Sequence, residues 1–138
     1  MDFFKNLLGN KIRKVDLTGL FENWITKINI NSSLDEEIVA INFGIFESEN
    51  GYMVYITGSN EYDPDDDDWA SEINFEPSQN LKYFNIPSEL TKDIHWEEVQ
   101  SDIESTLKKI IAQNKDLNLF KNRRITTGFD DGNLVRIA

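Results

Sequence analysis

The chain has 138 residues, a length typical of one domain with a buried core, so we expect residues 1–138 to form a single domain. Its formal net charge of −11 disfavours binding to nucleic acid or to an anionic membrane, and a hydrophobic content of 39% argues against wholesale disorder. The absence of cysteine excludes disulfides, a thiolate nucleophile and cysteine-ligated zinc.

The N-terminal stretch Met1–Gly9 has apolar pairs but no unbroken apolar run and no small-residue cleavage site. It predicts a short amphipathic turn of helix rather than a signal peptide. No run approaches the roughly 18 apolar residues of a membrane span, so we expect a cytoplasmic protein. A helix is predicted next, capped by Asp16 or Thr18 and reaching about Lys27. Its apolar positions share one face: Leu20, Phe21, Trp24, Ile25 and Ile28.

A β-hairpin is predicted after this helix. Ile38–Glu47 is rich in Ile, Val and Phe, and Tyr52–Thr57 alternates as a returning strand. Between them, Asn50–Gly51 supplies the positive-φ positions that a tight hairpin turn needs. A weaker alternation at Ile73 and Phe75 predicts a third strand at Trp69–Glu76, and a short fourth strand is predicted at Leu81–Ile86.

The C-terminal third predicts a long helix and a second hairpin. The helix runs from about Ile94 to Asn114, with Thr91 or Asp93 as its N-cap. Its apolar stripe, at steps of 3 and 4, is Trp96, Val99, Ile103, Leu107, Ile110 and Ile111. The hairpin pairs Arg124–Phe129 with Asn133–Ile137 across an Asp-Gly turn. We therefore expect an α+β domain. Its largely antiparallel sheet is built from two hairpins plus one or two further strands, with two amphipathic helices packed on it.

The negative charge is concentrated in one segment. Residues 28–81 contain no Lys or Arg but thirteen Asp and Glu residues, which leaves 12 acids against 14 bases elsewhere. At the centre of this segment lies Glu61–Trp69, with six carboxylates and two aromatic side chains. A field of this sign attracts basic partners or cations. The sequence therefore predicts a binding surface for a basic protein, and the alternative is a solvated loop that only keeps the protein soluble.

Aromatic residues beside charged ones are typical of protein interfaces, and Tyr62 and Trp69 flank the aspartates. For Trp69, burial in the core is the alternative to an exposed anchor. The predicted partner-binding residues are Glu61, Tyr62, Asp63, Asp65, Asp66, Asp67, Asp68, Trp69 and Glu72.

Other chemistry has weaker support. Asp63, Asp65 and Asp67 have the 1-3-5 spacing of a calcium loop, but Asp68 stands where that loop needs Gly and Asn74 where it needs Glu. Adjacent exposed carboxylates also lack the unequal environments of a catalytic pair. We therefore expect no enzyme activity, no catalytic residue, no metal and no cofactor. A divalent-cation-binding or small hydrolytic domain that uses the Asp-rich loop remains an alternative.

The remaining candidates for chemistry are one histidine and a basic group. His95 is expected to be a partly exposed structural residue at a helix start. The basic residues near the C-terminus are expected to pair with the domain's own acids: Lys115, Lys121, Arg123 and Arg124.

Two segments, Ile56–Ala70 and Thr127–Ile137, together resemble a pattern of small acidic bacterial proteins. Such proteins are similar to the immunity proteins of polymorphic or contact-dependent toxin systems. The two segments cover about 26 of the 138 residues. The resemblance implies a non-enzymatic protein that binds and blocks a cognate toxin, often a basic nuclease, by occlusion. A general acidic protein-interaction domain is the further alternative.

Overall fold

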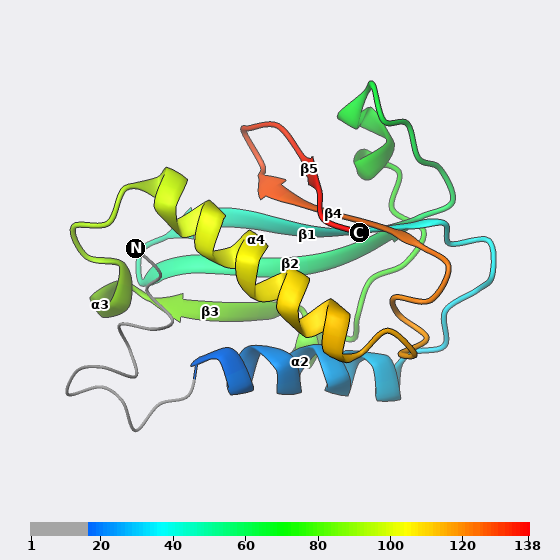
Figure 1. The fold of residues 1–138 in the computed structure, drawn as a ribbon, viewed down its shortest axis with the longest axis horizontal. Coiled ribbons are helices and arrows are strands. Elements are labelled where there is room, and N and C mark those ends of the chain that lie inside the picture. Colours follow the sequence, from blue (N-terminus) through cyan, green and yellow to red (C-terminus); the bar gives the residue numbers. More distant parts are fainter. Residues whose placement is uncertain (1–16) are drawn as a thin grey trace.

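The structure, a computed structural model, describes residues 17–138, so the predicted turn at Met1–Gly9 and the candidate cap Asp16 lie outside it. Within that range, no helix is both long and apolar enough to cross a membrane. Figure 1 shows the elements in chain order: α2 (Leu17–Asn31), β1 (Ala40–Ser48), β2 (Gly51–Ser59), η1 (Asp67–Ser71), η2 (Gln79–Leu81), β3 (Tyr83–Pro87), α3 (Ser88–Thr91), α4 (Trp96–Gln113), β4 (Arg124–Phe129) and β5 (Val135–Arg136).

The five strands form one sheet in the order β3-β2-β1-β4-β5. Three of the four strand pairs are antiparallel, and β1 pairs with β4 in parallel. A parallel neighbour requires a long crossover, which the segment from β2 through α4 provides. The fold is thus α+β with a mostly antiparallel sheet, as the sequence predicts.

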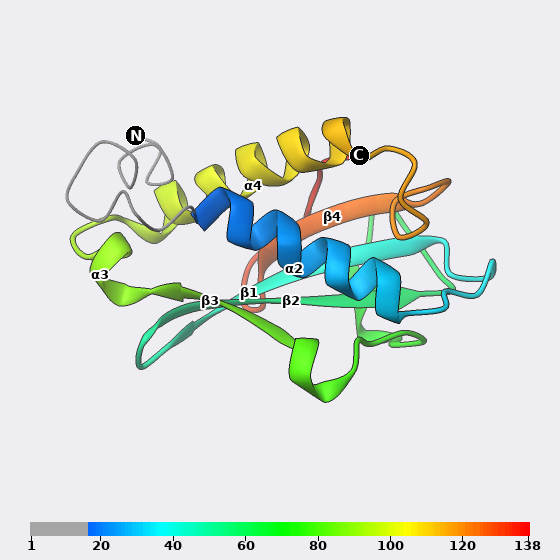
Figure 2. The same cartoon turned by 90° about the horizontal axis from the view of Figure 1, so that it is seen from below.

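Both long helices lie on the same face of the sheet (Figures 1 and 2). The core between helices and sheet is apolar; its fully buried members include Phe21, Ile25, Ile28, Ile41, Phe43, Ile45, Ile56, Ile103 and Leu107. Phe21 of α2 stacks on Phe84 of β3, with ring centroids 4.7 Å apart. The indole Nε1–H of Trp24 donates to the carbonyl oxygen of Leu81 at 2.8 Å, which joins α2 to η2.

The hairpin between β1 and β2 depends on one glycine. Ser48 pairs with Gly51, so the two loop residues are Glu49 and Asn50. Gly51 has φ +131°, and a Cβ there would lie 2.0 Å from the carbonyl oxygen of Ile86. Glycine is therefore required both by the backbone conformation and by the close approach of β3. The predicted turn is present, with positive φ at Gly51 and not at Asn50.

Three local predictions were wrong. Trp69–Glu76 is not a strand, since it holds most of the 3₁₀ helix η1 and only Phe75 makes an isolated bridge, to Gly58. The N-cap of α4 is His95, whose Nδ1 accepts from the Glu97 N–H at 3.3 Å. Neither Thr91 nor Asp93 caps that helix: Thr91 ends α3 and Asp93 has φ 65°. The C-terminal hairpin is also shorter than predicted, because only Val135 and Arg136 form β5.

Candidate functional site

Residues 60–72, called the acidic loop below, follow β2 and include η1. On the strands, Asn42, Thr57 and Thr126 alternate with core residues, so they belong to the sheet face opposite the helices. All three are buried, and Asn42 lines a small cavity together with Ala70 and Ser71 of the loop. The acidic loop therefore covers part of the face that the helices leave open.

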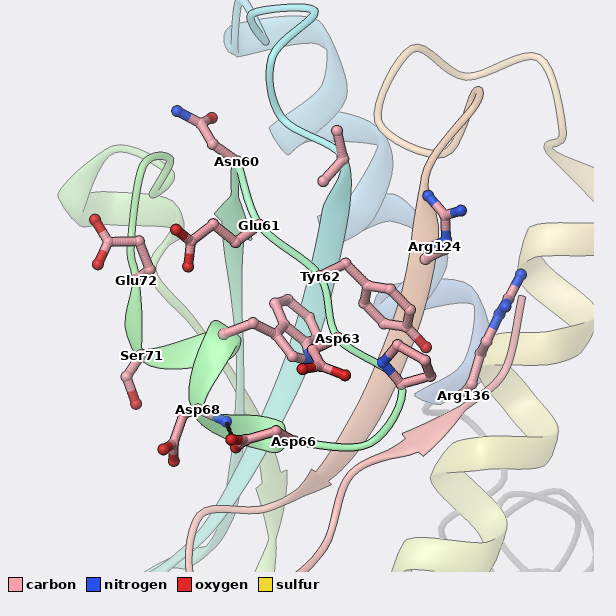
Figure 3. Close-up of a pocket in the computed structure, with 13 residues that line it drawn as sticks. Asn60, Glu61, Tyr62, Asp63, Asp66, Asp68, Ser71, Glu72, Arg124 and Arg136 are labelled. Atoms are coloured by element: carbon pink, nitrogen blue, oxygen red, sulfur yellow. Dashed lines mark hydrogen bonds between the residues drawn. The ribbon is translucent and has the colours of Figure 1, made fainter.

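The acidic loop owes its shape to its own aspartates. Asp63 Oδ1 accepts from the Asp65 N–H at 2.9 Å. Asp66 is the N-cap of η1, and its Oδ1 accepts from the Asp68 N–H at 2.9 Å (Figure 3). Asp67 Oδ2 accepts from the Leu134 N–H at 3.0 Å, which ties the loop to the connection between β4 and β5. Three of the predicted binding residues, Asp63, Asp66 and Asp67, thus hold the backbone in place.

The other four carboxylates of the loop have no such function. Glu61, Asp65, Asp68 and Glu72 are exposed, and within residues 17–138 their side chains accept no hydrogen bond and form no ion pair. They remain fully available to a partner. The loop therefore combines fixed geometry with unpaired negative charge.

The two aromatic residues of the loop differ in exposure. Trp69 is only 5% exposed, so of its two alternatives the structure shows burial. Its ring centroid lies 5.2 Å from that of Tyr62, which is half-buried. The guanidinium carbon of Arg124 lies 5.3 Å from the Tyr62 ring centroid, within cation–π distance. Trp69 anchors the loop to its own domain, and Tyr62 remains partly accessible between Trp69 and Arg124.

A cleft of about 940 Å³ opens between the acidic loop and the sheet. Glu61, Asp68 and Glu72 line one side of it, and Arg124 and Arg136 line the other (Figure 3). Neither arginine forms an ion pair with the described residues: Arg124 lies over Tyr62, and Arg136 Nε donates to the Ala138 carbonyl at 3.1 Å. The cleft is thus acidic on one wall and basic on the other.

Arg123 was expected to pair with acidic side chains, but in the structure it binds backbone carbonyls. Its Nε donates to the Ile38 carbonyl at 2.8 Å, its Nη2 to the Asp35 carbonyl at 3.0 Å, and its Nη1 to the Asn118 carbonyl. Burial lowers the pKa of this guanidinium. Arg123 therefore fastens two loops to each other through backbone carbonyls and is not part of a charged surface.

Sequence reasoning missed the basic wall of the cleft. Arg124 and Arg136 are far from the acidic loop in sequence and reach it only through the pairing of β4 with β1 and of β5 with β4. One signal pointed there: Thr127–Ile137 belongs to the same resemblance as the acidic segment. The bond from Leu134 to Asp67 joins these two segments in space.

The described residues include no group of three or more His, Asp or Glu side chains placed to hold a metal ion. Comparisons of the chain with protein-family models, with curated proteins and with solved structures found no match. The functional interpretation therefore rests on the geometry of this surface and on the resemblance of the two segments.

Proposed function

We propose that this protein binds and neutralises a basic protein toxin, in the manner of an immunity protein, without catalysing a reaction. The observation that carries the proposal is the set of four exposed, unpaired carboxylates on a loop that three other aspartates hold in shape. A preorganised surface loses less conformational entropy on binding than a flexible one. It also concentrates a negative field that speeds encounter with a cationic target.

Nucleases bind the phosphates of their substrate with Lys and Arg side chains. Glu61, Asp65, Asp68 and Glu72 present negative charge that such side chains can pair with instead. In this proposal the acidic loop covers the basic groove of the toxin, and Tyr62 adds aromatic contact area at its border. Inhibition by occlusion needs no catalytic group on the inhibitor, and it places the protein in the compartment of its target, which we propose to be the cytoplasm.

The cation-binding or hydrolytic alternative has less support. Three of the loop carboxylates accept backbone N–H groups. The acids of residues 17–138 also do not converge as hard cations require. A general acidic interaction domain would use the same surface, and only the identity of the partner distinguishes it from an immunity protein.

The test is binding of the full chain to the basic product of the neighbouring gene, measured by calorimetry at about 0.15 M and about 1 M NaCl. The loop variant carries E61Q, D65N, D68N and E72Q. The matched control removes four exposed charges elsewhere, with E36Q, E49Q, E89Q and D116N. We expect the loop variant to lose about 30-fold or more in affinity and the control about 3-fold or less.

Co-expression provides the functional readout: the wild-type chain is expected to protect cells from the toxin, and the loop variant to protect poorly. Binding that responds neither to salt nor to the loop substitutions would refute the acidic surface as the binding site. Tight binding without protection would support the general interaction domain instead.

A further inference from the structure

A second cavity, of about 600 Å³, lies at the end of the sheet where β1 and β4 end and β2 begins. Within residues 17–138, its lining residues include neither lysine nor arginine. Four aromatic and three acidic side chains define its chemistry: Phe46, Glu47, Tyr52, Trp96, Phe129, Asp130 and Asp131. None of them belongs to the acidic loop.

Two of these aromatic side chains, Tyr52 and Trp96, pack edge-on against Phe129. The Tyr52 ring lies 5.8 Å from it at an interplanar angle of 74°, and the Trp96 ring lies 5.6 Å from it at 84°. Tyr52 and Phe129 are buried, whereas Trp96 is 50% exposed at the start of α4. The cavity thus has a buried aromatic floor and one aromatic wall that is open to solvent.

The acidic side chains surround this aromatic floor. Glu47, Asp130 and Asp131 are all exposed. Asp130 is fixed by a hydrogen bond from the hydroxyl of Tyr55. The Tyr55 ring lies over Gly44, so close that a Cβ on that glycine would be 2.0 Å from Cζ of the tyrosine. Burial and the Asp130 carboxylate raise the pKa of Tyr55, so the hydroxyl remains a donor.

We propose that this cavity accepts a cationic side chain, a lysine ammonium or an arginine guanidinium, from the basic partner protein. The π faces of Trp96 and Tyr52 attract a cation, and carboxylates within the same cavity neutralise its charge. A neutral apolar ligand would contact the aromatic floor but leave the negative charge of the carboxylates uncompensated. The inference rests on the proposed function, since it names a second contact for the same partner.

The cavity and the acidic loop belong to one continuous surface. The connection between β4 and β5 contributes Asp130 and Asp131 to the cavity, and a few residues later its Leu134 N–H donates to Asp67 of the loop. Asp67 of the loop also lines a small cavity together with Phe129 and Asp130, so the two sites adjoin each other. An interface of ordinary size, about 800 Å² on each partner, can cover both.

Trp96 provides a specific reporter for this cavity. Trp24 and Trp69 are 7% and 5% exposed, so their indole N–H resonances serve as internal controls. The full chain is titrated with Nα-acetyl-lysine methylamide, Nα-acetyl-arginine methylamide and the neutral Nα-acetyl-norleucine methylamide while amide and indole resonances are recorded. We expect saturable shifts of the Trp96 indole with a cationic probe, and an affinity about 5-fold or more weaker for norleucine.

Two double variants distinguish the effect of the cavity carboxylates from the effect of the protein's overall negative charge. E47Q combined with D131N is expected to weaken binding of the cationic probe about 5-fold or more. D65N combined with D68N removes the same charge from the acidic loop and should change it by less than about 2-fold. Equal affinity for norleucine, or equal effects of the two variants, would overturn the proposal.

Partner binding is the second readout. Weaker binding by both double variants supports the two-point contact. If only the loop variant weakens it, the proposal for the cavity fails and the proposed function stands. If the partner binds both variants and the wild-type chain equally, the proposed function itself fails, and saturable probe binding at Trp96 would then identify a cation site for another basic protein.

Discussion

The aspartates of the acidic loop are expected to respond to substitution in opposite directions. Asp66 caps η1, and its replacement by alanine removes the acceptor for the Asp68 N–H. Loss of an N-cap costs about 0.5–2 kcal/mol of the free energy of unfolding. The Asp68 side chain accepts no hydrogen bond from residues 17–138, so Asp68→Asn removes only a charge. We expect D66A to destabilise the protein and D68N to stabilise it slightly.

The size of the stabilisation follows from Coulomb's law. Two unit charges about 6 Å apart in water repel by about 0.7 kcal/mol, and screening at about 0.15 M salt roughly halves this value. Asp68 follows Asp65, Asp66 and Asp67 directly in the chain. Part of the repulsion persists in the unfolded chain, because these residues remain sequence neighbours there. The net gain for D68N is therefore about 0.2–0.5 kcal/mol.

Urea unfolding followed by tryptophan fluorescence measures both effects. At about 1 M salt, where the Debye length is near 3 Å, the gain of D68N should disappear, while the loss of D66A should persist. D66N is the matched control for D66A, because it removes the charge and keeps the acceptor. If D68N destabilises the protein as much as D66A at both salt concentrations, Asp68 has a structural role and is not a free binding carboxylate.

Three further predictions concern the supports of this surface. Gly44→Ala should lower the free energy of unfolding by about 1–3 kcal/mol, because the Tyr55 ring occupies the space of the new Cβ. The same substitution should cost much less in a Y55A background, where that ring is absent. Arg123→Met should cost about 1–3 kcal/mol in thermal unfolding, since it removes the hydrogen bonds to the Ile38 and Asp35 carbonyls. The exposed Lys121→Met should change stability by less than about 0.5 kcal/mol. The pKa of Tyr55 is raised above its ordinary value of 10.0, so above that pH the folded state keeps a proton that the unfolded state loses. The free energy of unfolding should therefore fall as pH rises above 10.0, and it should fall less in Y55F.

Each of these predictions has an outcome that contradicts it. Equal destabilisation by G44A in both backgrounds would show that the ring of Tyr55 does not lie over the glycine. An R123M variant as stable as K121M would exclude the carbonyl contacts as a support. Identical alkaline unfolding profiles for the wild-type chain and Y55F would contradict the coupling of Tyr55 to Asp130.

Local periodicity predicted the regular elements well. The stripe along α4 placed that helix within two residues of its observed start, Trp96, and within one of its end, Gln113. The alternation at Ile73 and Phe75 failed as a strand signal, because it spans too few residues to outweigh local capping. Asp66 begins a 3₁₀ turn that buries Trp69, and after it Ile73 is left 50% exposed. A short alternation is therefore a weak predictor where an aspartate can cap the backbone.

The sequence predicted only part of the residues that make up the candidate site. Counting charges along the chain found the acidic loop but not the basic wall of the cleft, because Arg124 and Arg136 approach it through long-range strand pairing. Asp130 and Asp131 were predicted only as part of a hairpin turn. Their contribution to a second acidic cavity depends on the positions of Trp96 and Phe129, which no local pattern specifies.

The division of the loop carboxylates into structural and exposed ones is the strongest support for the proposal that this surface binds a partner. A loop that served solubility alone would need no fixed shape, yet Asp63, Asp66 and Asp67 each accept a backbone hydrogen bond. Conversely, a purely structural loop would not need Asp65 and Asp68, whose side chains add repulsion and make no hydrogen bond or ion pair with residues 17–138. The repulsion among the unpaired carboxylates opposes folding in the free protein. When a cationic partner binds, it relieves this repulsion, and the same charges then contribute to affinity.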